Sequence, residues 1–171
     1  MPWYLALIAV VVVERLAELR LSRRNLAWTV RQGGREYAAG HYRFMVVLHT
    51  GWLVGCVVEV LLADRPFLPG LGWPMLALVL GSQVLRWWCI ATLGPRWNTR
   101  IAVVPGVPLV AVGPYRWLRH PNYVAVVVEG AALPLVHTAW ITAFVFTGLD
   151  LVLLRIRIRA ENAALMLAVS P

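Results

Sequence analysis

The chain has 171 residues, enough for one domain, of which 60% are hydrophobic and only 14% are charged. Its mean hydropathy of +0.70 excludes an ordinary soluble domain and is typical of a polytopic membrane protein. The formal net charge of +8 comes entirely from arginine, since the sequence contains no lysine. Because the arginines flank apolar runs, this charge indicates membrane topology rather than nucleic-acid binding.

Five apolar segments predict an all-α integral membrane protein with about five transmembrane helices. In chain order they cover roughly residues 3–21, 44–63, 73–93, 123–135 and 139–154. A full span needs about 20 apolar residues, so the fourth is short unless Pro121 opens it and it continues past Pro134. We expect the fourth and fifth segments to form a tight hairpin around Pro134 and His137.

The distribution of arginine predicts the orientation of these helices. Three of the polar connections and tails are rich in arginine: Arg20, Arg23, Arg24, Arg31, Arg35 and Arg43 after the first segment, Arg96, Arg100, Arg116 and Arg119 after the third, and Arg155, Arg157 and Arg159 after the fifth. The alternate loops hold only Arg65, beside Asp64, or no arginine. The positive-inside rule then places the N-terminus outside and the C-terminus in the cytoplasm.

Ionisable residues also occur within the first three segments, where such groups are costly and are functional or paired by default. We interpret Glu14, Arg15 and Glu18 as residues at the cytoplasmic interface. Glu59 and Arg86 are candidates for a structural ion pair.

The histidine, cysteines and glycines of the second and third segments are predicted to have packing roles. His49 lies on an apolar helix, where a hydrogen-bonded packing residue is favoured over a catalyst. Cys56 and Cys89 lie in apolar runs without metal-ligand spacing, so we expect them to pack and predict no metal site. Gly51 and Gly55 form a small-xxx-small face that favours packing within the monomer, although a weak homodimer stays open.

The segment Gly-Pro-Tyr-Arg-Trp-Leu-Arg-His-Pro-Asn-Tyr of residues 113–123 carries the densest chemistry in the chain. Pro114 and Pro121 each fix φ and disfavour helix at the preceding residue. The pattern therefore predicts a shaped loop that leads into a helix at the membrane border, with His120 and Tyr123 near its start.

The run that follows the fifth segment alternates arginine with apolar residues up to Glu161 and Asn162. On a helix, Arg157 and Glu161 lie four residues apart and share a face. One interpretation is a solvated helix end with anchoring arginines. The other is a cation and a carboxylate that point into a cytoplasmic pocket.

Taken together, the Gly-Pro-Tyr-Arg-x-x-Arg-His-Pro-x-Tyr segment, the hairpin and the later Arg157-Ile-x-x-Glu161 resemble the isoprenylcysteine carboxyl methyltransferase family. Its members are integral-membrane methyltransferases that use S-adenosylmethionine, and the resemblance covers roughly residues 93–165. The upstream part, from Glu14 to Tyr42, resembles a shorter bacterial branch. Some of that branch accompany type III polyketide synthases and O-methylate alkylresorcinols or alkylpyrones.

The resemblance implies a cytoplasmic cofactor pocket formed by the last two helices and their flanking loops. It divides the single domain, residues 1–171, into three helices in 1–93 and a cofactor loop, hairpin and C-terminal tail in 94–171. The implied contacts to S-adenosylmethionine come from Val107, Pro108, Leu109, Val110, Tyr115, His120, Pro121, Asn122, Tyr123 and Glu161. Arg157 is implied to face the substrate and to be the catalytic residue. The chain departs from the family at Val107, where histidine is frequent, and at Asn162, where a second acid is frequent.

The chemistry of methyl transfer suits these residue types. An in-line displacement at a sulfonium-bound carbon needs positioning and exclusion of water more than acid–base catalysis. Tyr115 or Tyr123 can face a sulfonium by cation–π attraction, and Glu161 can bind the ribose hydroxyls or the amine of the cofactor. Arg157 can orient an oxyanionic nucleophile. The proline-rich stretch 104–114 is then a cofactor lid, or else a plain interfacial loop.

Further residues are candidates for the substrate pocket. His41 and Tyr42 lie at the cytoplasmic start of the second segment. Trp97 and Asn98 either line an entrance for a lipid chain or belong to an interfacial tryptophan belt. Glu129 is either a general base or hydroxyl acceptor, or a buried hydrogen-bonding residue.

The sequence therefore predicts methyl transfer from S-adenosylmethionine to an oxygen of an amphiphilic, lipid-like acceptor in a bacterial cytoplasmic membrane. An alkylresorcinol or alkylpyrone is the leading acceptor, followed by an isoprenylcysteine carboxylate and a small thiol. One alternative is a nicotinamide-dependent membrane reductase of unsaturated lipids, because such proteins share the C-terminal architecture. Another is a non-enzymatic membrane scaffold or carrier.

Overall fold

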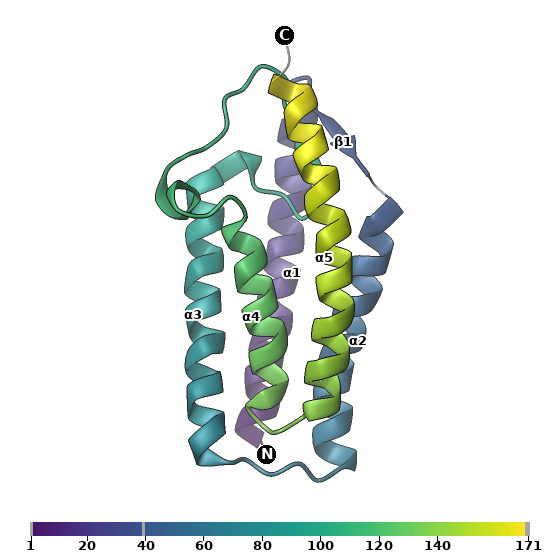
Figure 1. The fold of residues 1–171 in the computed structure, drawn as a ribbon, viewed down its shortest axis with the longest axis vertical. Coiled ribbons are helices and arrows are strands. Elements are labelled where there is room, and N and C mark those ends of the chain that lie inside the picture. The colour runs from purple at the N-terminus through teal and green to yellow at the C-terminus, as the bar shows by residue number, and fades with distance from the viewer. Residues whose placement is uncertain (1, 39, 170–171) are drawn as a thin grey trace.

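The computed structural model describes residues 2–38 and 40–169, which form a bundle of five α-helices (Figure 1). The helices are α1 (Pro2–Arg31), α2 (Gly40–Leu62), α3 (Pro69–Leu93), α4 (Pro121–Leu135) and α5 (Trp140–Val169). Two 3-10 turns, η1 (Gly94–Arg96) and η2 (Gly113–Arg116), follow α3 and precede α4. Short strands β1 (Arg35–Tyr37) and β2 (Ile101–Val103) pair antiparallel, with Glu36 opposite Ala102. The prediction of an all-α fold is confirmed.

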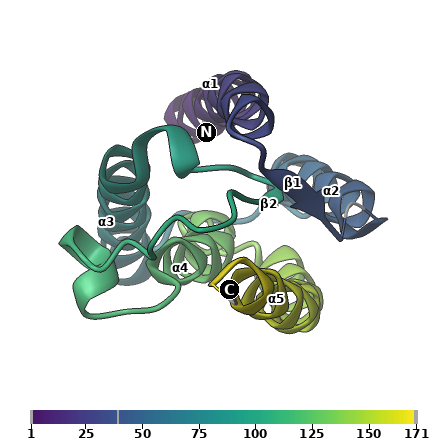
Figure 2. The same ribbon diagram turned by 90° about the horizontal axis from the view of Figure 1, so that it is seen from above.

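The polar connections of the bundle gather at one of its two ends. The N-terminus lies at one end, and the C-terminus, β1 and the long connection before α4 lie at the other (Figure 1). Viewed along the bundle, α4 lies between α3 and α5, against which it packs (Figure 2). We call the end with the C-terminus the polar end of the bundle.

Two helices are by themselves long and apolar enough to cross a membrane. They are the segments Tyr42–Leu62 and Pro69–Arg96. Large apolar side chains such as Val47, Val84 and Phe144 are about 70% exposed on the outside of the bundle. An apolar exterior of this kind needs lipid or another apolar partner around it, as expected of a membrane protein.

The two longest helices extend beyond their apolar sequence. The apolar pattern ended at residues 21 and 154, whereas α1 continues to Arg31 and α5 to Val169. Their additional turns are polar or amphipathic and lie at the polar end of the bundle. At the end of α1, Gly33 adopts a φ of +77°, and Gly34 N–H donates to the carbonyl of Thr29 at 2.9 Å. This is the Schellman arrangement, which satisfies the last carbonyls of a helix.

The predicted hairpin between the last two helices is confirmed. Pro121 opens α4, whose last residue is Leu135, one past Pro134. His137 Nδ1 lies 3.2 Å from the carbonyl oxygen of Arg65, and the Thr138 hydroxyl donates to the carbonyl of Pro66 at 2.9 Å. These bonds fix the turn against the α2–α3 connection.

The apolar core lies in the half of the bundle at the end where α1 begins. Its centre includes Tyr4 and Trp52, whose polar atoms donate to the carbonyls of Leu133 and Gly130, both at 3.1 Å. Cys56 belongs to this core, and Cys89 is buried on α3, so both cysteines pack as predicted.

Two further packing predictions are confirmed in this region. His49 Nδ1 lies 2.8 Å from the carbonyl oxygen of Met45, as expected for a hydrogen-bonded packing residue. A Cβ atom on Gly55 would lie 3.0 Å from Thr142 Oγ1, so this glycine allows close packing of α2 on α5 within the monomer. The corresponding position at Gly51 is open.

One prediction about intramembrane charges is wrong. Glu59 pairs with Arg65 at 2.9 Å and accepts the backbone N–H groups of Ile141 and Thr142, so it caps the start of α5 instead of pairing with Arg86. Glu18, which the sequence placed at the cytoplasmic interface, is buried inside the bundle.

The side chain of Arg15 also points into the bundle, whereas the side chain of Glu14 lies on its surface. Arg15 Nη1 lies 2.9 Å from Glu18 Oε2, and its Nη2 lies 3.7 Å from Glu129 Oε1. Glu14 Oε1 accepts the indole N–H of Trp87 at 3.2 Å on the exposed surface.

Candidate active site

The 3-10 turn η2 forms a tight turn shortly before α4. Gly113 has a φ of +57°, and a Cβ atom there would lie 2.6 Å from Thr92 Oγ1, so only glycine fits. Tyr115 hydrogen-bonds to the Cys89 thiol on α3. Burial raises the pKa of the Tyr115 hydroxyl well above its usual value, and the nearby Cys89 adds to the rise. Tyr115 therefore stays protonated and holds the turn against α3.

The start of α4 meets α5 in a cluster centred on the hydroxyl of Tyr123. This hydroxyl donates to Glu161 Oε2 and accepts a hydrogen bond of 2.8 Å from Arg157 Nε. The rings of His120 and Tyr123 stack with centroids 5.4 Å apart. His120 Nδ1 lies 3.9 Å from Glu161 Oε1, and its Nε2 lies 3.1 Å from Asn162 Oδ1. We call Tyr123, Arg157, Glu161, His120 and Asn162 the Tyr123 cluster.

Arg157 points into the bundle, whereas its neighbours point outward. It is 7% exposed, while Arg155 and Arg159 are exposed. Its Nη1 lies 3.3 Å from Met45 Sδ on α2, and its Nη2 donates to the carbonyl of Thr99. The interpretation of this run as solvated anchors therefore holds for the two neighbours and not for Arg157.

The predicted cofactor residues lie in two places. His120, Tyr123 and Glu161 come together in the Tyr123 cluster, and Pro121 is buried at the start of α4. The stretch 107–110 lies in the long connection, where Pro108 and Leu109 are exposed and Arg96 Nη1 donates to the Pro108 carbonyl at 2.9 Å.

Asn122 lies at the first turn of α4, beside the cluster. Its side-chain oxygen is buried and has no hydrogen-bond partner within the described ranges 2–38 and 40–169. An amide oxygen of this kind is available to a ligand.

The predicted substrate residues differ in their surroundings. The Arg100 guanidinium lies 4.3 Å from the ring centroid of Tyr42 and binds Glu36 at 2.9 Å. The side chain of His41 lies outside the described part of the chain. Trp97 is only 3% exposed, which excludes it from an interfacial belt. Asn98 Oδ1 accepts the Ser22 hydroxyl at 2.6 Å.

Glu129 lies deeper in the bundle than the Tyr123 cluster. It forms an ion pair with Arg86 and accepts a hydrogen bond of 2.8 Å from Gln83. The sequence left two roles open for Glu129, and these contacts correspond to a buried hydrogen-bonding residue.

The sequence did not predict the residues of α1 that hydrogen-bond to the segment 94–99, which in turn contacts Arg157. Ser22 Oγ lies 2.7 Å from Thr99 Oγ1, and Asn25 Nδ2 donates to the carbonyls of Trp97 and Gly94 at 2.7 and 3.2 Å. Thr99 in turn offers its carbonyl to Arg157. The available signal was the helical spacing of the polar residues on α1, which share one face with buried Glu18.

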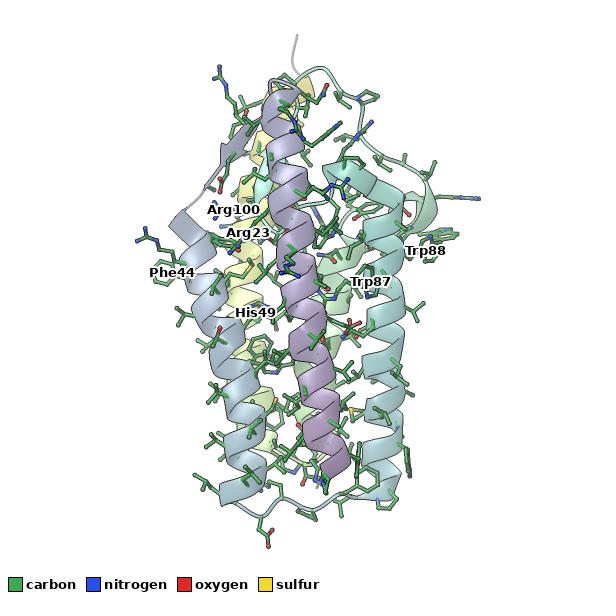
Figure 3. The ribbon with its side chains drawn as sticks, turned by 180° about the vertical axis from the view of Figure 1, so that it is seen from behind. Arg23, Phe44, His49, Trp87, Trp88 and Arg100 are labelled. Carbon is green, nitrogen blue, oxygen red and sulfur yellow. The ribbon has the colours of Figure 1, made fainter. Side chains whose placement is uncertain are left out.

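A groove beside this region opens between α1 and α2. It has a volume of about 570 Å³, and its apolar wall consists of Leu19, Leu26, Ala27 and Val30. Its polar part includes Ser22, Tyr42, Arg23, Arg31 and Arg100. Figure 3 shows Arg23 and Arg100 on this side of the bundle, level with the start of α2. Apolar walls with a cationic edge suit an amphiphile with an electron-rich head.

Comparison with known proteins assigns the class. The model of the isoprenylcysteine carboxyl methyltransferase (ICMT) family matches residues 75–167, which contain the whole Tyr123 cluster. The chain belongs to this family of methyltransferases, and two of its helices are long and apolar enough to cross a membrane. It is similar to the uncharacterized protein YpbQ of Bacillus subtilis, with 40% identity over 160 residues, 93% of this chain and 94% of the relative. An uncharacterized protein of Haemophilus influenzae is 22% identical over 158 residues, 92% of this chain and 91% of that relative.

Proposed function

We propose that the protein transfers a methyl group from S-adenosylmethionine to an oxygen of a lipid-like acceptor at the polar end of the bundle. The proposal is supported chiefly by the continuous contact from Arg157 through the Tyr123 hydroxyl to Glu161. This contact joins a buried cation to a carboxylate that reaches solvent. The family supports S-adenosylmethionine as the donor, since ICMT methyltransferases generally use it.

Each member of the Tyr123 cluster has a role in this proposal. The cofactor supplies an electrophilic methyl group on a sulfonium. Glu161, which is partly exposed, accepts hydrogen bonds from the cofactor's hydroxyl or amino groups. The face of Tyr123 can lie toward positive charge, because the ring already has the Arg157 guanidinium 5.8 Å from its centroid. Asn122 adds its unpartnered amide oxygen.

Arg157 orients the acceptor oxygen. Its guanidinium is held at three points, by Tyr123, Met45 and Thr99, so little side-chain entropy is lost when an oxyanion binds. In the transfer, the bond from sulfur to the methyl carbon breaks as the bond from oxygen to that carbon forms. The acceptor oxygen loses its proton to water beforehand, so no oxidant or metal is required.

The acceptor enters from the bilayer and the cofactor from the cytoplasm. The groove between α1 and α2 is the proposed entrance, because Ser22 in its wall contacts Thr99, which contacts Arg157. An alkylresorcinol or alkylpyrone is the leading acceptor, and an isoprenylcysteine carboxylate is the second. This arrangement requires five spans, with the polar end of the bundle in the cytoplasm.

Calorimetric titration with S-adenosylhomocysteine and with NADPH tests the reaction class. We expect binding of S-adenosylhomocysteine alone. Binding of NADPH alone would indicate a membrane reductase, and binding of neither would indicate a scaffold or carrier. Membranes incubated with methyl-labelled S-adenosylmethionine and a lipid extract should then yield a labelled lipid that identifies the acceptor.

A further inference from the structure

A second group of polar side chains lies inside the bundle, closer to its middle than the Tyr123 cluster. Helices α1, α3, α4 and α5 all contribute to it. We call this group the polar layer, and its members are Arg15, Glu18, Gln83, Arg86, Glu129 and Asp150.

Most of the polar layer is internally paired. Arg86 forms a buried ion pair with Glu129, and its Nε lies 3.6 Å from Glu18 Oε1. Gln83 connects the two sides, because its amide donates to Glu129 at 2.8 Å and its oxygen accepts from Arg15 at 3.1 Å. Charges inside a membrane protein are expensive, so a paired network of this kind is the expected outcome.

Asp150 is the exception. Its side chain is 1% exposed, and neither carboxyl oxygen has a hydrogen-bond partner among the residues the structure describes. Two donors, Arg86 Nε and Arg15 Nε, and one acceptor, Glu18 Oε1, are likewise buried without a hydrogen bond in the described ranges. Such atoms destabilise a fold unless something binds them.

The position of Asp150 relates it to the proposed reaction. Asp150 and Arg157 lie seven residues apart, two turns of α5, and both point into the bundle. At a rise of 1.5 Å per residue their backbones are about 10 Å apart along the helix. The unpaired carboxyl oxygens of Asp150 therefore lie about two turns along α5 from the group that we assign to the acceptor oxygen.

We propose that the polar layer binds a second hydroxyl group of the acceptor, with Asp150 as the residue that recognises it. A hydroxyl donates a hydrogen bond, so it can satisfy the Asp150 carboxyl, which has no partner among the described residues. The ligand class is a dihydroxylated or hydroxylated ring with an alkyl tail, and Asp150 determines specificity without touching the reacting oxygen. This inference rests on the proposed function for the identity of the ligand as the acceptor.

The test uses two probes that differ by one hydroxyl, 5-pentadecylresorcinol and 3-pentadecylphenol. Their binding to the full chain in detergent is followed by quenching of tryptophan fluorescence. We expect the wild type to bind the resorcinol at least about tenfold more tightly, the effect of one hydrogen bond to a charged group. Asp150→Leu should reduce this preference to within about twofold while leaving the affinity for the phenol unchanged.

Two controls separate recognition from folding. Asp64→Asn changes the other aspartate of the chain, which is exposed, and should keep the preference. Without a ligand, Asp150→Leu should unfold at the same temperature as the wild type or a higher one, because it removes a buried carboxyl that has no partner. A structural role for Asp150 would instead lower the unfolding temperature.

Several outcomes would overturn the proposal. They are equal binding of the two probes by the wild type, binding of neither probe, a preference that survives in Asp150→Leu, and a lowered unfolding temperature of that variant. If the polar layer holds only water, the wild type would show no preference for the resorcinol, or Asp150→Leu would retain that preference. Failure of the methyl-transfer proposal appears separately, as loss of S-adenosylhomocysteine binding in a protein that still discriminates between the probes.

Discussion

The hydroxyl of Tyr123 is the single atom that joins the proposed cofactor and acceptor sides of the active site. It donates to Glu161 and accepts from Arg157 at 2.8 Å. Tyr123→Phe keeps the ring and removes both bonds, and His120→Ala removes the stacked imidazole. Since a lost buried hydrogen bond costs about 1–3 kcal/mol, we expect S-adenosylhomocysteine affinity to fall roughly tenfold or more in each variant. Calorimetric titration measures this, with Tyr37→Phe on β1 as control. Wild-type affinity in both folded variants would show that the cofactor binds elsewhere.

Arg157 and Glu161 contact the same hydroxyl but differ in exposure, so we predict different kinetic roles. Glu161→Gln keeps the shape and removes the charge, and it should mainly raise the apparent KM for S-adenosylmethionine. Arg157→Lys loses the planar fork that binds Tyr123 and Thr99, and it should lower kcat with cofactor binding nearly intact. Steady-state kinetics on both variants in one detergent provide the measurement.

Arg159→Lys is the matched control for that experiment, because Arg159 lies half a turn away and is exposed. If Arg157→Lys and Arg159→Lys both behave as wild type, Arg157 has no catalytic role. Circular dichroism of each variant confirms that the bundle has formed.

The residues of this cluster could be identified from the sequence because chain order brings them together. His120 and Tyr123 share one short motif, and Arg157 and Glu161 share one face of a helix. Met45 and Thr99, which complete the contacts of Arg157, lie 112 and 58 residues away from it in the sequence. Neither has a local pattern, so only the packing of α2 and β2 against α5 reveals them.

The helix α1 shows how one face can serve two environments. Its buried residues are apolar at Tyr4, Ile8 and Val11 and polar at Glu18, Ser22, Asn25 and Thr29, at intervals of four and three residues apart from the seven between Val11 and Glu18, which is two turns. This spacing keeps a single stripe toward the other helices. The apolar half packs in the core, and the polar half holds the connection between α3 and β2.

We predict that Asn25→Ala destabilises the protein through that connection. The variant loses the hydrogen bonds to the carbonyls of Trp97 and Gly94, which costs about 1–3 kcal/mol when the carbonyls are buried. The apparent unfolding temperature should fall by several degrees, at about 2–4 °C per kcal/mol. Thermal unfolding in detergent checks this. Arg24→Ala, on the exposed face of the same turn, should change little.

The ion pair between Arg86 and Glu129 joins α3 to α4 and gives a second test at this scale. Glu129→Gln removes the carboxylate that pairs with the buried Arg86 guanidinium and leaves only Glu18, 3.6 Å from Arg86 Nε, as a counter-charge, so we expect a loss of up to about 3–5 kcal/mol in stability. Replacing both partners, as Arg86→Met with Glu129→Leu, should recover most of that loss, because a buried pair is often no better than apolar packing. Thermal unfolding of the single and double variants separates the two cases, and equal instability of both would contradict this view of the pair.

The helices could be predicted from the sequence where their residues are apolar. Pro121 at the start of α4 and the turn before α5 followed from local rules. The polar turns of α1 and α5 were not predicted, because their helical state depends on packing at the polar end rather than on hydropathy. The partner of Glu59 was also mispredicted, since spacing along the chain does not reveal which helices are neighbours.

Residues 2–38 and 40–169 form an odd number of α-helices, five, and the start of α1 and the end of α5 lie at opposite ends of the bundle (Figure 1). The arginine-rich connections gather at the end with the C-terminus, together with β1, β2 and the Tyr123 cluster. If the polar end lies in the cytoplasm, the positive-inside rule and access to a water-soluble cofactor are both satisfied. The opposite orientation would place the arginines and the Tyr123 cluster outside the cell.

Reporter fusions test this orientation. A fusion after the C-terminus and one inserted at Asp64, in the exposed α2–α3 connection, should report opposite compartments, with the C-terminus cytoplasmic. A third fusion at Gly106, in the exposed connection before η2, should agree with the C-terminus because both lie at the polar end. This third position matters because α4 has 15 residues and spans only about 22 Å, less than the hydrocarbon core of about 30 Å. If Gly106 instead agreed with Asp64 and differed from the C-terminus, α3 would not cross the membrane, and α4 and α5 together would cross it once rather than as a hairpin, which would contradict the five-span arrangement.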